Sequence, residues 1–211
     1  MSIYEAVIFD LGGVVFASPF EAFDVYDRRA GHPSGTTRGI IRTSSETGAW
    51  AALERGELNA AEFHRALNDE GLALGFIIDA AAIMATIGEG SGARPEMLHA
   101  IRTLRANGFK VGALTNNWAD ERGSTTPLGL DSVDGFDGVI ESAKVGLRKP
   151  DPRIYELACT MLATAPDRCV FLDDLGINLK PARAMGMATI KVSDPAVALR
   201  ELGAIVGLNL V

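Results

Sequence analysis

Short apolar runs that end in turn or polar residues recur along the chain. The first, Ala6–Phe9, combines β-branched and aromatic residues and is followed by Asp10 and two glycines. Such a run predicts a strand buried on both faces, with a sharp turn after it. Comparable runs predict further strands over residues 110–114, 136–140, 169–172 and 188–192.

Helical patterns separate the later strands and predict helices over residues 95–107, 152–163, 175–185 and 195–205. Strands that alternate with helices predict a parallel sheet with helices on both faces, which is an α/β fold. Residues 120–135 are rich in turn formers, and residues 144–150 are expected to form a loop.

No strand pattern is found between residues 17 and 90, so this segment is expected to be all-helical. Helices are predicted over residues 20–30, 49–55 and 76–87, and a capping box at Asn59 and Glu62 begins another that runs to Ala73. Residues 36–48 are polar and poorly periodic. The helical segment leaves the core after the first strand, over the same edge as Asp10, and is interpreted as a lid.

Polar residues follow the apolar strands at points that a parallel sheet brings to one edge. They are Asp10, the pair Thr115 and Asn116, and the pair Asp173 and Asp174, with Lys149-Pro150 on a nearby loop. Taken singly, each has an ordinary structural explanation: an aspartate can cap a helix, a threonine can close a turn and a lysine can be solvated. Together they indicate a ligand site at the carboxyl ends of the strands.

The chemistry that this set could share is phosphoryl transfer through a covalent aspartyl intermediate. Asp10 would attack phosphorus, and the backbone N–H groups of Leu11 and Gly12 could hold phosphate oxygens. Thr115 and Asn116 would donate further hydrogen bonds.

Positive charge is needed beside a dianionic substrate, and Lys149 is the candidate side chain that supplies it. Asp10, Asp174 and a carbonyl of the turn would hold Mg²⁺, a hard cation that prefers oxygen ligands. Without the metal, the carboxylates would repel the substrate.

The ordered motifs Asp10-x-Gly-Gly, Thr115-Asn, Lys149-Pro and Asp173-Asp174 resemble the haloacid dehalogenase superfamily over nearly the whole chain. The surrounding stretches are similar to the phosphatase domain found at the N-terminus of soluble epoxide hydrolases and to its bacterial relatives. That resemblance implies a Rossmann-like core, residues 1–16 and 93–211, with an inserted all-helical cap, residues 17–92, that selects the substrate. It also implies Mg²⁺ on Asp10, Asp174 and the Gly12 carbonyl, with Asp173 and Asn178 close to the site.

Gly12 departs from the family pattern, in which phosphatases usually carry a second aspartate two residues after the nucleophile. The backbone carbonyl remains, but the side chain that serves as general acid and base is lost, a group typically worth about 10²–10⁴ in rate. His32 or His64 of the lid could replace it, although a histidine on a helix is more often a packing or surface residue. Loss of this group also argues against a phosphomutase.

Two other functions stay open. A 2-haloacid dehalogenase uses the same nucleophile without a metal, but Asp173 and Asp174 would repel a haloacid carboxylate. A weakly catalytic protein that keeps the fold for binding is the other, and the intact Asp10, Lys149 and Asp174 argue against it. The first alternative is separated from the phosphatase by metal dependence.

Candidate pocket residues come from the lid and the catalytic edge. Phe20, Trp50 and Phe63 could face the substrate or form the core of the lid. Trp118 follows the second strand directly and is the better candidate. A small phosphorylated metabolite is the expected substrate.

Composition limits the partners. The net charge is −7 and no block of like charge occurs in the 211 residues, which argues against nucleic-acid binding. No apolar run approaches the roughly 18 residues of a membrane span, and the first residues lack a signal-peptide pattern, so no membrane association and a cytoplasmic location are expected. Cys159 and Cys169 are expected to be buried free thiols.

Overall fold

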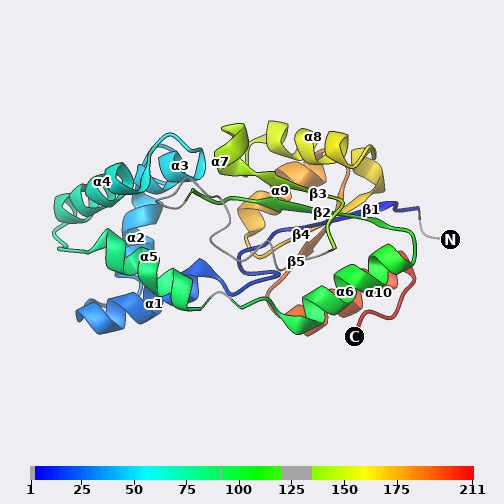
Figure 1. The fold of residues 1–211 in the computed structure, drawn as a ribbon, viewed down its shortest axis with the longest axis horizontal. Helices are drawn as coiled ribbons and strands as arrows, with labels where there is room; N and C mark the ends of the chain where they lie inside the picture. Colours follow the sequence, from blue (N-terminus) through cyan, green and yellow to red (C-terminus); the bar gives the residue numbers. More distant parts are fainter. Residues whose placement is uncertain (1–2, 91, 120–134) are drawn as a thin grey trace.

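The computed structural model describes residues 3–90, 92–119 and 135–211, and within them a parallel sheet forms the centre of the molecule (Figure 1). Five strands pair in the order β3-β2-β1-β4-β5, all of them parallel. The strands are β1 Ala6–Phe9, β2 Lys110–Thr115, β3 Gly138–Glu141, β4 Cys169–Asp173 and β5 Ala188–Lys191. The predicted α/β class is confirmed, and β1 lies in the middle of the sheet.

Alternate residues of the central strands β1 and β4 enter two different cores, which is why these strands read as continuous apolar runs. In β1, Val7 and Phe9 pack with helices α6 (Pro95–Ala106) and α10 (Pro195–Val206). Ala6 and Ile8 belong to the other core, which includes residues of α8 (Pro152–Met161) and α9 (Gly176–Ala184). In Figure 1 these two helix pairs cover opposite faces of the sheet.

Five helices between β1 and α6 form a separate layer beside the carboxyl end of the sheet (Figure 1). We call them the inserted helices: α1 Pro19–Ala30, α2 Thr36–Thr43, α3 Ala49–Glu54, α4 Ala60–Ala73 and α5 Ala80–Glu89. They share a core of their own, made largely of aromatic and branched aliphatic side chains. The capping box predicted at the start of α4 is present, since Asn59 and Glu62 exchange hydrogen bonds of 3.0 Å.

Three helix boundaries differ from the sequence-based expectation. Residues 36–43 form α2, because the Asp27 carboxylate accepts hydrogen bonds from the Thr37 N–H at 3.2 Å and from its hydroxyl at 2.6 Å. Helix α5 begins at Ala80 rather than at residue 76, because Asp79 caps it through the N–H groups of residues 81 and 82. Part of the expected loop over residues 144–150 is helical, as α7, Ser142–Val145.

The remaining elements agree with expectation. A 3-10 turn, Pro166–Arg168, precedes β4, and Cys159 and Cys169 are free and buried as predicted. The turn-rich stretch predicted over residues 120–135 falls, except for its last residue, outside the described residues. Among the described helices, none has the length and apolarity needed to cross a membrane.

Candidate active site

The strand order brings three of the predicted polar positions together. Because β1 is flanked by β2 and β4, Asp10 follows β1 at the level where β2 ends in Thr115 and β4 ends in Asp173. The Asp10 N–H donates to the Leu172 carbonyl at 2.9 Å, which extends the pairing with β4 by one step. The register of the parallel strands is therefore sufficient to place these three side chains at the carboxyl edge of the sheet.

Lys149 reaches this edge from the loop before α8 and lies between two carboxylates. Its Nζ is 2.8 Å from Asp10 Oδ2 and 2.7 Å from Asp173 Oδ2, and its side chain is 1% exposed. Burial by itself would lower the pKa of Lys149, but the two carboxylates outweigh it and raise the pKa, so the ammonium stays charged. Most lysines are solvated, so a buried lysine with two acidic partners marks a site.

Asp173 has partners on both carboxylate oxygens besides Lys149. Oδ1 accepts from the Leu175 N–H at 2.8 Å, and the Asn178 side-chain amide lies 3.1 Å from both oxygens. The main chain of Asn178 is held in turn, because its main-chain carbonyl accepts a hydrogen bond from the Tyr155 hydroxyl at 2.6 Å. These contacts orient Asp173 toward Lys149.

A divalent cation fits the carboxylates at this edge. Asp10, Asp173 and Asp174 each offer an oxygen, and the three oxygens lie within 4.8 Å of one another. Burial raises the pKa of Asp10 well above its ordinary value, and Asp173 and Asp174 add to that rise while Lys149 opposes it. Burial also raises the pKa of Asp174 to about 6, helped by Asp173. The raised pKa values of Asp10 and Asp174 indicate that these two carboxylates lack nearby positive charge, and carboxylate oxygens are the ligands that Mg²⁺ prefers.

The turn after Asp10 depends on the conformation of Gly13 and on a hydrogen bond from Arg94. Gly13 has φ +80°, and a Cβ there would lie 2.3 Å from Asp174 Oδ2. A Cβ at Gly12 would have Pro19 Cδ as its nearest neighbour, at 3.4 Å. The Arg94 guanidinium donates to the Gly13 carbonyl at 3.0 Å. Gly13 is therefore the glycine that this turn requires, whereas Gly12 leaves room for a side chain.

We predict that Gly13→Ala lowers the free energy of unfolding by at least about 1 kcal/mol, because alanine at a left-handed φ is strained and its Cβ would collide with Asp174. Gly12→Ala is the matched control and should cost less, since its Cβ meets no atom closer than 3.4 Å. Urea unfolding of both variants measures the difference. Equal stability of the two would contradict the geometry of this turn.

Asn116 and two residues that the sequence analysis missed form a polar cluster beside Lys149. Asn116 donates from Nδ2 to Glu54 Oε2 at 3.3 Å, and Arg148 Nε donates to the same Glu54 oxygen at 2.7 Å. Glu54 comes from α3 and is 6% exposed. Nothing in the sequence links positions 94 residues apart, although the place of Arg148 directly before Lys149 is a weak signal.

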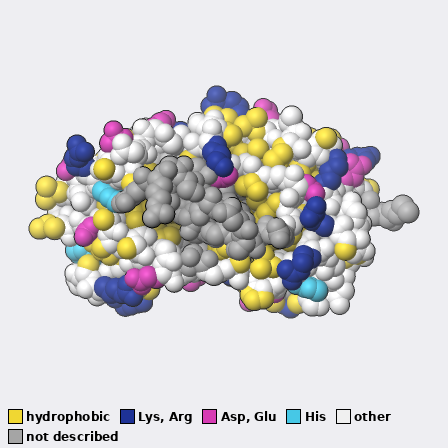
Figure 2. All heavy atoms as spheres, viewed as in Figure 1, with side chains coloured by type: hydrophobic (Ala, Val, Ile, Leu, Met, Phe, Trp, Pro, Cys, Tyr) yellow, Lys and Arg dark blue, Asp and Glu magenta, His cyan; other side chains and the backbone are white. Residues whose placement is uncertain are grey.

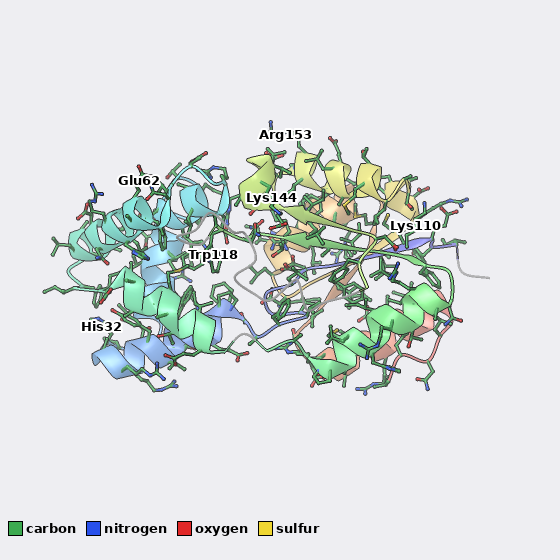
Figure 3. All side chains as sticks on the ribbon, in the orientation of Figure 1. His32, Glu62, Lys110, Trp118, Lys144 and Arg153 are labelled. Atoms are coloured by element: carbon green, nitrogen blue, oxygen red, sulfur yellow. The ribbon has the colours of Figure 1, made fainter. Side chains whose placement is uncertain are left out.

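The other predicted site residues are at or near the edge. The Thr115 side chain is buried, and its hydroxyl lies 3.4 Å from the Asn116 carbonyl. The Leu11 N–H donates to Asp10 Oδ1 at 2.6 Å. Trp118 is 7% exposed and lies where the inserted helices meet the sheet (Figure 3). Its ring is 5.5 Å from that of Trp50.

The lid residues weighed as pocket or acid candidates contribute to packing. Phe20, Trp50 and Phe63 belong to the core of the inserted helices. His32 packs edge-on against Phe76 and lies at the outer end of those helices, away from Trp118 (Figure 3). His64 lies next to the Phe63 ring, with centroids 5.8 Å apart. Figure 2 shows basic and acidic side chains interspersed over the face in view.

The chain is similar in sequence to a family of known hydrolases and to parts of two longer proteins. Residues 4–186 match the family model of the haloacid dehalogenase-like hydrolases. The chain is 36% identical over 211 residues to Acyl-CoA dehydrogenase family member 10 of Mus musculus, covering 98% of this chain and 20% of that protein. It is 34% identical over 217 residues to Bifunctional epoxide hydrolase 2 of Sus scrofa, covering 97% and 39%. The chain thus spans well under half of these two relatives.

A relative of matching length is Sesquiterpene phosphatase astK of Aspergillus oryzae, 30% identical over 208 residues and covering 97% of both chains. Among solved structures, a dehalogenase with an intermediate complex superposes with a TM-score of 0.69 at 20% identity, covering 99% of both chains. A HAD family enzyme of Bacteroides thetaiotaomicron, in complex with magnesium and inorganic phosphate, has a TM-score of 0.61 at 20% identity and covers 89% of this chain and 93% of that one. At these identities the two structures establish the fold.

Proposed function

Since the chain belongs to the haloacid dehalogenase-like hydrolase family, we propose that it is a Mg²⁺-dependent phosphatase that hydrolyses a small phosphomonoester through an aspartyl-phosphate intermediate. The observation that carries this proposal is the buried Lys149 ammonium, 2.8 Å from Asp10 and 2.7 Å from Asp173 at the carboxyl edge of the sheet. A lysine fixed beside a carboxylate nucleophile supplies positive charge where an incoming phosphoryl group brings negative charge.

In the first step an Asp10 oxygen forms a bond to phosphorus, and the bond from phosphorus to the leaving oxygen breaks. The leaving oxygen takes a proton from solvent, because position 12 carries no acid. In the second step water attacks phosphorus and gives up a proton to solvent, the bond from phosphorus to Asp10 breaks, and phosphate and the free carboxylate are released. Lys149 offsets the charge of the nucleophile and the phosphoryl group in both steps, while the Thr115 hydroxyl and the Gly12 N–H would hold phosphoryl oxygens. The Leu11 N–H and the Asn116 side-chain amide, also expected to hold phosphoryl oxygens, donate instead to Asp10 and to Lys149 and Glu54.

Asp10, Asp174 and the Gly12 carbonyl would hold Mg²⁺, while Asp173 and Asn178 would orient the site around Lys149. When bound, the metal supplies charge that neutralises the phosphoryl oxygens and the carboxylates. The raised pKa values of Asp10 and Asp174 support this assignment. So does the family enzyme from Bacteroides thetaiotaomicron, which is described in complex with magnesium and inorganic phosphate.

Residues 17–92 would act as the cap that selects the substrate, over a core of residues 1–16 and 93–211. The core that the inserted helices share supports such a division, because among the described residues Trp118 is its one buried member from outside residues 17–92. Trp118, at the junction of the two parts, would line the substrate pocket. The full-length match to a sesquiterpene phosphatase supports a phosphorylated small molecule as the substrate.

The direct test is hydrolysis of a panel of phosphomonoesters, with p-nitrophenyl phosphate as the reference, in the presence of Mg²⁺ and after removal of metal with EDTA. We expect phosphate release that EDTA abolishes and added Mg²⁺ restores. Release of chloride from (S)-2-chloropropionate without metal, and no phosphate release, would instead support a dehalogenase. If neither reaction is detected, the result would point to a binding protein that keeps the fold.

The second aspartate of family phosphatases is absent, so the rate should depend steeply on the pKa of the leaving group. Aryl phosphates and sugar C1-phosphates are expected to react well, and primary alkyl phosphates poorly. Gly12→Asp should raise kcat/KM for alkyl phosphates selectively, by up to about 10²-fold, because a positioned acid protonates the departing oxygen. The first carbon of the new side chain has room, since Pro19 Cδ is its nearest neighbour at 3.4 Å.

A graded series of leaving groups, measured for wild type and Gly12→Asp, gives the two slopes. Gly12→Asn controls for the added bulk without the acid. A shallow slope already present in the wild type would show that another residue supplies the proton, and His64→Gln would then be compared with it.

A further inference from the structure

Glu54 is a buried carboxylate of the inserted helices whose partners include residues of the catalytic edge. Its Oε2 accepts from Arg148 Nε at 2.7 Å and from Asn116 Nδ2 at 3.3 Å. Its Oε1 accepts from Trp50 Nε1 at 2.9 Å, so the side chain is held in one orientation from its own helix. A single carboxylate on α3 thus joins the inserted helices to the end of β2 and to the loop that carries Lys149.

The Asn116 side chain, which contacts Glu54, also forms hydrogen bonds with the main chain of Lys149. Its Oδ1 accepts from the Lys149 N–H at 2.8 Å, and its Nδ2 donates to the Lys149 carbonyl at 3.1 Å. Both backbone polar groups of the lysine are therefore bonded to one side-chain amide. Because Nδ2 is shared between Lys149 and Glu54, loss of the Glu54 carboxylate removes one of the three hydrogen bonds that hold this amide within the described chain, and the only one of them that comes from the inserted helices.

The ammonium of Lys149 has little tolerance for movement. It makes its contacts with Asp10 and Asp173 at 2.8 and 2.7 Å from a side chain that is 1% exposed. A displacement of about 1 Å in a catalytic group can cost on the order of 10²-fold in rate. Hydrogen bonds from Glu54 to Asn116, and from Asn116 to Lys149, therefore connect the position of α3 with the position of the ammonium.

We infer that Glu54 is a positioning residue: through Asn116 and Arg148 it fixes the main chain of Lys149, so that the catalytic edge is fully assembled when the inserted helices are seated on it. This inference rests on the proposed function where it takes Lys149 to serve the phosphoryl group. It assigns to the inserted helices a role in assembling the site, in addition to selecting the substrate. Opening of the helices would loosen Lys149, and closing would restore it.

Four variants test the inference. Glu54→Ala removes both acceptor oxygens, and Glu54→Gln keeps one. Glu70→Gln is the matched control for the stability of the inserted helices, because Glu70 binds the Ser44 hydroxyl and the Ala49 N–H within them, at 2.9 and 2.7 Å. Glu46→Gln is the control for charge beside Arg148, since Glu46 lies 3.6 Å from that guanidinium with a side chain that is 63% exposed.

The first readout is steady-state hydrolysis of p-nitrophenyl phosphate with Mg²⁺. We expect Glu54→Ala to lower kcat by about tenfold to 10²-fold with a smaller change in KM, and Glu54→Gln to recover part of the loss. The two control variants should stay within about twofold of wild type. A loss in Glu70→Gln equal to that in Glu54→Ala would overturn the inference, because folding of the helices would then explain both.

The second readout does not depend on activity. Hydrogen exchange at the Lys149 N–H, followed by NMR in the whole protein, should be faster in Glu54→Ala and Glu54→Gln than in Glu70→Gln. Unchanged protection of this N–H in both Glu54 variants would overturn the inference, whatever happens to the rate. If Glu54→Ala does not fold, Glu54→Gln decides by the same comparison.

Failure of the proposed function has a different signature. A wild-type protein that releases no phosphate would overturn the phosphatase assignment, while exchange at Lys149 would still decide whether Glu54 holds that loop. Wild-type activity with unaltered kcat in both Glu54 variants would overturn the inference and leave the phosphatase assignment intact.

Discussion

Replacing Asp10 with asparagine is expected to lower kcat/KM for phosphomonoesters by about 10⁴-fold or more, as loss of a covalent nucleophile does in other hydrolases. An amide cannot form the bond to phosphorus that the proposed first step requires. The fold should survive, because the asparagine Oδ1 can still accept a hydrogen bond where Asp10 now accepts from the Leu11 N–H at 2.6 Å. Phosphate release from p-nitrophenyl phosphate, with circular dichroism and thermal unfolding alongside, measures both expectations.

Asp69→Asn is the matched control, since it makes the same change on an exposed position of α4. It should keep wild-type activity. An Asp10→Asn variant that still turns over p-nitrophenyl phosphate at a substantial rate would refute the assignment of the nucleophile.

Lys149→Met should reduce kcat/KM by the equivalent of about 3 kcal/mol or more, which is on the order of 10²-fold. Water does not replace a fixed charge in a site where the side chain is 1% exposed. The variant also leaves Asp10 and Asp173 without their shared cation, and removal of one partner from a buried ion pair typically costs about 3–5 kcal/mol of stability. Kinetics below the unfolding transition, and urea unfolding, separate the two effects.

Lys144→Met provides the comparison. Lys144 lies close in sequence and pairs with Glu141 at 2.6 Å, but its side chain is 59% exposed. Its Glu141 partner is 10% exposed, but water still solvates and screens the Lys144 ammonium, so this variant should keep an activity close to that of wild type. A change of less than about tenfold in Lys149→Met would mean that its charge does not serve the reaction.

Periodicity was sufficient to predict the centre of the sheet because β1, β2 and β4 are buried on both faces. In β1 the alternation of Val7 and Phe9 with Ala6 and Ile8 serves two different cores, so every position is apolar and the run stands out. The polar residues that follow such runs are then placed by topology, since parallel strands bring their carboxyl ends to one edge. Asp10, Thr115 and Asp173 could be grouped on this basis without coordinates.

Apolar periodicity did less well at the start of helices whose first N–H groups bind a side-chain carboxylate. Helix α2 begins at Thr36 because Asp27 of α1 accepts from Thr37, a contact that no pattern within residues 36–48 contains. Helix α5 begins at Ala80, later than the apolar stretch at Phe76 suggests, because the Asp79 carboxylate accepts hydrogen bonds from the first N–H groups of the helix. In both places a side-chain carboxylate determined the boundary.

The sequence by itself determined the fold class, the edge of the sheet that carries the chemistry and the residue types there, because these depend on period, order and chain direction. The tertiary structure decided which carboxylates Lys149 contacts, which of the two glycines after Asp10 leaves room for a side chain, and that Glu54 reaches Asn116 and Arg148 from α3. The first outcome depends on how the loop before α8 lies at the edge of the sheet, the second on the turn after β1, and the third on the packing of α3 against that edge. The contact between Glu54 and Arg148 spans 94 residues, and packing at that separation leaves no local trace in the sequence.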